Sequence, residues 1–73
     1  MNYVKTIELT WHTKITFFNK NNEEVITYYD GSPTIKYAKV IYDSGEIESV
    51  ELYISDNKYI TLYSIASYKI RTY

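Results

Sequence analysis

The sequence predicts a small all-β domain: a partly open antiparallel barrel or a strongly bent meander of five or six strands. Isoleucine, valine and threonine supply 22 of the 73 residues and aromatic residues another 13, and these types favour strands. Only two alanines and three leucines are present, so no stretch favours a helix. Apolar and polar residues alternate with period two over much of the chain, which is typical of half-buried strands. The length fits a single domain over residues 1–73.

The N-terminal third predicts two strands. Residues alternate from Tyr3 to Phe17, which indicates one long bent strand or a tight hairpin near Trp11-His12-Thr13. No Gly or Pro marks a turn there, so we favour the bent strand. A loop at 19–22 and a returning strand at 24–29 follow, and Asp30-Gly31-Ser32-Pro33 is the strongest turn signal in the chain.

The C-terminal half predicts a three-stranded meander over residues 34–42, 46–54 and 58–63. Gly45 and Asn57 each close a short polar segment, and both suit the left-handed third position of a three-residue loop. Such loops place Ala38 opposite Val50, Leu52 opposite Ile60, and Val50 opposite Leu62. They also place Val40 opposite Glu48 and Ile41 opposite Ile47. The even apolar positions then share one face.

The alternation breaks after Tyr63, where Ser64-Ile65-Ala66-Ser67 predicts a short 3₁₀ turn near 63–67 before a last strand over 68–73. A meander, a 3₁₀ turn and a final strand resemble the end of small SH3-like and Sm-like barrels. This resemblance covers roughly residues 34–73 and lies in the order of elements, without a diagnostic motif. It therefore implies a fold and no function.

Composition restricts the function classes. Eight Lys and Arg against nine Asp and Glu give a net charge of −1, which disfavours binding of nucleic acid through bulk charge and also disfavours a DNA mimic. No apolar run reaches membrane-spanning length and the N-terminus lacks a signal-peptide core, so we expect a cytoplasmic protein without membrane contact. The absence of Cys fits a reducing compartment. Frequent Ile, Tyr, Lys and Asn suggest an AT-rich source, such as a Gram-positive bacterium or its phage.

No residue pattern points to catalysis. His12 is the single histidine; on a continuous strand it would share a face with Glu8 and Thr10. A surface histidine beside Trp11 is the simpler interpretation, because a domain this small rarely encloses a pocket. Metal-ligand spacings and a glycine-rich phosphate loop are both missing from the sequence. We therefore expect no enzymatic activity, no metal and no cofactor.

Charge is uneven along the chain. Five acids and no Lys or Arg lie between Asp43 and Asp56, with Lys36 and Lys39 before them and Lys58 after. Cross-strand pairs between these groups are the simpler interpretation. The alternative is an acidic stripe that meets a basic partner.

The tyrosines carry the functional prediction. In the predicted register Ile35, Tyr53 and Tyr59 line up across three strands, Tyr37 lies beside Glu51, and Tyr63 follows on the same face. These rings could be covered by the N-terminal strands, could bind a protein, or could stack bases while Lys39, Lys58 and Lys69 hold phosphates. We expect a non-enzymatic protein-interaction module that binds another protein or a second copy of itself. The predicted partner-binding residues are Tyr37, Tyr53, Tyr59, Tyr63 and Glu51, and the alternative function is binding of single-stranded nucleic acid.

Overall fold

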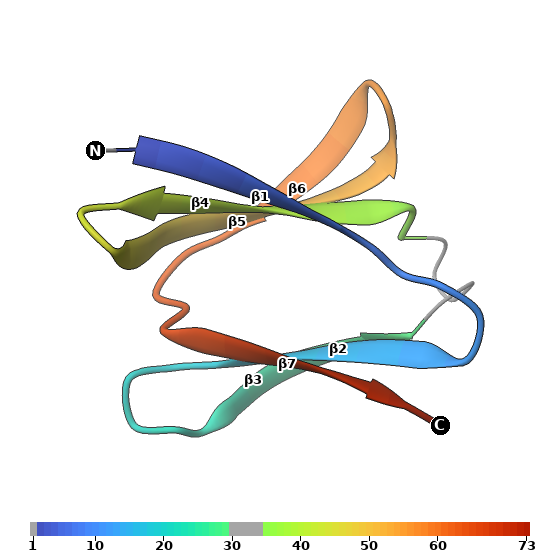
Figure 1. Cartoon of the computed structure of the whole chain (residues 1–73), viewed down its shortest axis with the longest axis horizontal. Coiled ribbons are helices and arrows are strands. Elements are labelled where there is room, and N and C mark those ends of the chain that lie inside the picture. Colours follow the sequence, from blue (N-terminus) through green and yellow to red (C-terminus); the bar gives the residue numbers. More distant parts are fainter. Residues whose placement is uncertain (1, 30–34) are drawn as a thin grey trace.

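Seven strands form two antiparallel sheets in the computed structural model, which describes residues 2–29 and 35–73 (Figure 1). The larger sheet has the order β1 (Asn2–Glu8), β4 (Tyr37–Asp43), β5 (Glu46–Ser55) and β6 (Lys58–Leu62). The smaller has the order β3 (Glu24–Tyr29), β2 (Thr13–Phe18) and β7 (Ser67–Thr72). The predicted all-β class is confirmed, but the described residues form seven strands rather than five or six, in two open sheets rather than a partly open barrel or a single meander. The turn predicted at Asp30–Pro33 lies outside the described residues.

The two sheets lie as separate layers, and the chain passes between them after β1 and again after β6 (Figure 1). The space between the layers is filled by one apolar cluster. Period-two alternation turns every second side chain of each strand toward it. Its fully buried members come from both sheets: Ala38, Val40, Val50 and Leu52 from the larger, and Ile15 and Phe17 from the smaller.

The favoured single strand over Tyr3–Phe17 is wrong. Strand β1 pairs with β4 and strand β2 pairs with β3 and β7, so the two belong to different sheets and do not form a hairpin with each other. A tight turn separates them, in which the Thr13 amide and hydroxyl donate to the Thr10 carbonyl at 3.2 and 2.6 Å. His12 supplies the left-handed φ of 59°, so the turn needs neither Gly nor Pro.

The predicted meander is confirmed in order and in the pairing of β5 with β6, where Leu52 lies opposite Ile60 and Val50 opposite Leu62. The first hairpin is shifted by two residues: Ala38 lies opposite Leu52, not Val50. Accordingly Val40 faces Val50 rather than Glu48, and Ile41 faces Ser49 rather than Ile47.

The shift comes from turn geometry. Asp43 pairs with Glu46 across a two-residue loop whose residues Ser44 and Gly45 have φ of 56° and 84°, and a bulge follows at Ile41/Tyr42. The second hairpin also turns at a two-residue loop, because Ser55 pairs with Lys58, and a similar bulge lies between Tyr53 and Ser55. The predicted three-residue loops are therefore wrong, and Asn57 does not have the predicted left-handed φ. Because a bulge adds one residue to one strand, it restores the even-to-even pairing that a two-residue loop alone would break. The apolar face is therefore kept.

The predicted 3₁₀ turn near 63–67 is also wrong. Residues 63–66 form an irregular link with a bend at Ser64, whose φ of 62° is left-handed and does not fit a right-handed 3₁₀ turn. The link turns Ile65 into the core and lets the Ala66 amide donate to the Phe18 carbonyl at 2.8 Å. The path of residues 63–66 is thus set by the burial of Ile65 in the core.

Candidate functional site

A row of stacked tyrosines crosses the outer face of the larger sheet. Strand register places Tyr37 opposite Tyr53 and Tyr53 opposite Tyr59. The ring centroids are 4.7 and 4.8 Å apart, with interplanar angles of 13° and 28°. We call these three residues the tyrosine row. Ile35, predicted to lie in it, is buried in the core. The two-residue register shift puts Tyr37, not Ile35, opposite Tyr53.

Polar contacts fix the central ring. The Tyr53 hydroxyl donates a 2.9 Å hydrogen bond to Glu51, two residues earlier on the same face. The Lys39 ammonium lies 5.0 Å from the Tyr53 ring centroid, within the range of a cation–π contact. Burial, together with the bond to Glu51, raises the pKa of Tyr53 to about 12. The row is therefore a preorganised surface, since its central ring is held on both sides and at its tip.

Exposure is lowest at the central ring of the row, Tyr53, and rises from there toward the sheet edge, while Tyr37 on the other side is half-buried. Tyr53 is 9% exposed, Tyr59 at the edge strand β6 is 48% exposed, and Tyr63 beyond that strand is 73% exposed. Four of the five predicted partner-binding residues are contiguous: Tyr37, Tyr53, Tyr59 and Glu51. Tyr63 stacks on no other ring in the described part of the chain.

The acidic segment divides between two environments. Glu51 lies directly opposite Lys39, and not beside Tyr37 as the predicted register placed it, because Tyr37 lies opposite Tyr53. Asp43 and Glu46 instead lie opposite each other beside the turn, and both are exposed. Exposed Glu48 lies within the bulged part of β5. The carboxylates therefore form no single continuous stripe.

A second aromatic group was missed by the sequence analysis. Trp11, His12, Tyr73 and Tyr29 form a chain of edge-to-face contacts with centroid distances of 4.7, 5.6 and 5.1 Å. The predicted alignment of His12 with Glu8 and Thr10 is not found, because β1 ends at Glu8. A contact between residues far apart in the sequence brings these rings together, since the Tyr73 amide donates to the His12 carbonyl at 2.9 Å. Alternation within each segment does not reveal such a contact.

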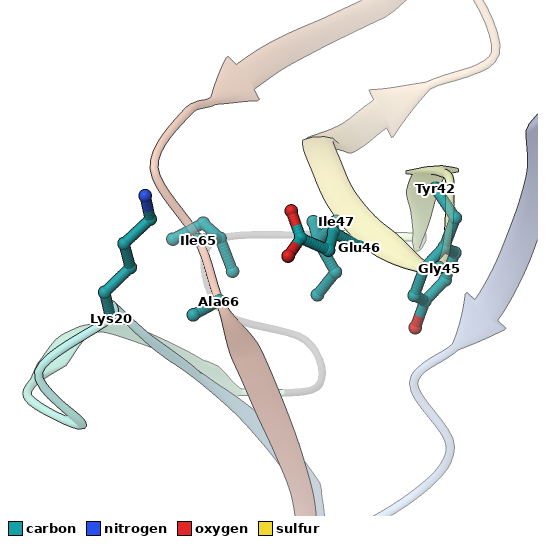
Figure 2. A pocket seen from close by; sticks show the side chains of 7 residues that line it. All are labelled: Lys20, Tyr42, Gly45, Glu46, Ile47, Ile65 and Ala66. Carbon is teal, nitrogen blue, oxygen red and sulfur yellow. The ribbon is translucent and has the colours of Figure 1, made fainter.

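A hollow of about 400 Å³ lies at one end of the sandwich. In Figure 2 the side chain of Lys20 lies on one side of it and those of Glu46 and Ile47 on the other, with Ile65 and Ala66 between them. Tyr42 also lines it, stacked on Tyr3 at 4.5 Å. Burial, with a hydrogen bond to Tyr68, raises the pKa of Tyr42 to about 12. This hollow marks where the core opens between the two layers.

Among residues 2–29 and 35–73, no three Asp, Glu or His side chains gather in a way that could hold a metal ion. The same residues include no helix long and apolar enough to span a bilayer. No protein-family model, curated protein or solved structure matches the chain significantly.

Proposed function

We propose that this chain is a non-catalytic protein-interaction module and that the tyrosine row, with Glu51 and with Tyr63 beyond the end of β6, is its contact surface. The observation that carries the proposal is the stacking of three tyrosines on the side of the larger sheet that faces away from the core. Tyrosine is enriched at protein interfaces because its ring offers a broad apolar contact and its hydroxyl a polar one.

Preorganisation supports this role. Binding normally costs about 0.5–1.5 kcal/mol for each flexible side chain that is immobilised. Tyr53 is already held by Glu51 and by two rings, so most of that cost is met in the unbound protein. Tyr59 and Tyr63 supply the accessible ring surface.

A second copy of the chain is the first partner to test. An interface about a two-fold axis must be complementary to itself. Lys39 and Glu51 lie directly opposite each other beside the row, so two copies facing each other can bring each cation onto the other's carboxylate. An interface centred on tyrosines depends only weakly on salt, in contrast to one built on phosphate contacts.

Sedimentation of the purified protein over rising concentration tests this proposal. Tyr59→Lys should weaken self-association at least about tenfold, the size expected for a central interface residue. Val25→Lys is a matched control, since Val25 is 49% exposed on the other sheet and Tyr59 is 48% exposed.

If the protein stays monomeric, immobilised wild type, Tyr59→Lys and Val25→Lys should be compared as baits. Loss of a captured protein with Tyr59→Lys alone supports binding of a different partner through the row. A monomer whose captured proteins are the same for all three baits contradicts the proposal.

A further inference from the structure

We propose that the outer face of the smaller sheet is a binding site for single-stranded nucleic acid. Alternation along β2 turns Ile15 and Phe17 inward, where both are fully buried. The other residues of this alternation, Lys14, Thr16 and Phe18, therefore face outward. They meet outward-facing residues of β3 and β7 around a hollow of about 360 Å³. The hollow is lined by Lys14, Thr16, Phe18, Glu24, Thr27, Tyr29, Lys69 and Arg71.

This face is locally basic although the whole chain has a net charge of −1. Among the described residues that line the hollow, three are cations and one, Glu24, is an acid. Moreover, Arg71 lies directly opposite Lys14 on the neighbouring strand. Like charges in that arrangement repel each other, and an anion bound between them would relieve the repulsion. The geometry thus favours an anionic ligand.

Aromatic rings lie within the same face. The Lys14 ammonium is 5.7 Å from the centroid of Tyr29, and the Lys69 ammonium is 5.7 Å from the centroid of Phe18. Tyr29 is 41% exposed. It begins the edge-to-face chain that runs through Tyr73 and His12 to Trp11, whose indole is 82% exposed.

Cations beside exposed aromatic rings favour one class of ligand. An acidic peptide would use the cations but would have no need of an exposed indole. Single-stranded nucleic acid uses both, because its phosphates bind Lys and Arg while its unpaired bases stack on aromatic rings. The cations at Lys14, Arg71 and Lys69 would bind successive phosphates, and Tyr29 and Trp11 would stack bases. This surface is separate from the tyrosine row, which lies on the other sheet, so the two proposals stand or fall independently.

The binding experiment uses fluorescence anisotropy of a labelled oligothymidine of about 12 nucleotides. Three phosphate contacts predict that the logarithm of affinity falls against the logarithm of salt with a slope of about −2. Trp11 is the single tryptophan, so quenching of its emission on titration gives a second and independent readout. Trp11→Ala should weaken binding in the anisotropy assay at least about fivefold.

Substitution of the cations locates the site. Lys14→Gln combined with Arg71→Gln should lower affinity on the order of 25-fold at 0.1 M salt and reduce the slope to about −0.7. The matched control is Lys36→Gln combined with Lys58→Gln, which removes the same charge from two exposed lysines outside the smaller sheet and should leave affinity unchanged. Circular dichroism of each variant verifies that it is folded.

Three results would overturn the proposal. One is the absence of binding at low salt. Another is an equal loss of affinity in the control variant, which would mean attraction by charge alone. The third is competition by polyglutamate as effective as competition by the unlabelled oligonucleotide, which would assign the face to an acidic protein.

Discussion

Replacing Leu52 should destabilise this protein far more than replacing Tyr59, although tyrosine is the larger side chain. Leu52 is fully buried, with Ala38 and Ile60 as its strand neighbours. Ala38 is too small to fill the space that Leu52→Ala would open, and the strand ladders prevent the backbone from collapsing into it. A Leu→Ala change in such a place costs about 3 kcal/mol.

The cost of Leu52→Ala is a large part of the total free energy of unfolding. A chain of 73 residues has a free energy of unfolding of roughly 7 kcal/mol at about 0.1 kcal/mol per residue. A loss of about 3 kcal/mol lowers the melting temperature by about 12–24 °C in a domain of this size. Tyr59, by contrast, is 48% exposed at the sheet edge and stacks on one ring, so Tyr59→Ala should cost about 1 kcal/mol.

Urea unfolding followed by far-ultraviolet circular dichroism measures both values. Emission from Trp11 is unsuitable, because that side chain is already 82% exposed in the folded state. Equal slopes against urea would show that the variants unfold from comparable states. If Tyr59→Ala proved the more destabilising change, the assignment of Leu52 to the inner face and of the tyrosine row to the outer face would be refuted.

Three further predictions concern single contacts. The pKa of Tyr53 is raised from 10.0 to about 12 in the folded state, so the free energy of unfolding that this shift contributes below about pH 10 should be lost as the pH rises toward 12. Glu51→Gln should lower the pKa of Tyr53 only in part, because burial is the larger cause. Phenolate absorbance during alkaline titration measures this pKa. The hydroxyls of Thr16 and Thr27 share a 2.8 Å hydrogen bond, so each Thr→Val change should cost about 1 kcal/mol and the double change less than the sum; additive costs in denaturant unfolding would argue against the bond. Gly45→Ala should cost about 1 kcal/mol through its φ of 84° alone, since a Cβ there would contact nothing within 4 Å; an unchanged melting temperature would contradict this.

The sequence by itself determined which side chains share a face. Alternation separates Leu52 from Tyr53 on any strand. The predicted register correctly placed Leu52 opposite Ile60 and Val50 opposite Leu62, although a two-residue loop with a bulge, not the predicted three-residue loop, produces it. The grouping of Tyr53 with Tyr59 follows from the same pairing. These features are local, since they depend only on period two and on a hairpin between adjacent segments.

The tertiary structure alone decided which strands are neighbours. The turn at His12 sends β1 and β2 into different sheets, and β2 pairs with β7 from the far end of the chain. That pairing brings Lys14 beside Arg71, a contact that no alternation within either segment specifies. Strand neighbours depend on how the two layers bury a common core, and that requirement acts over the whole chain.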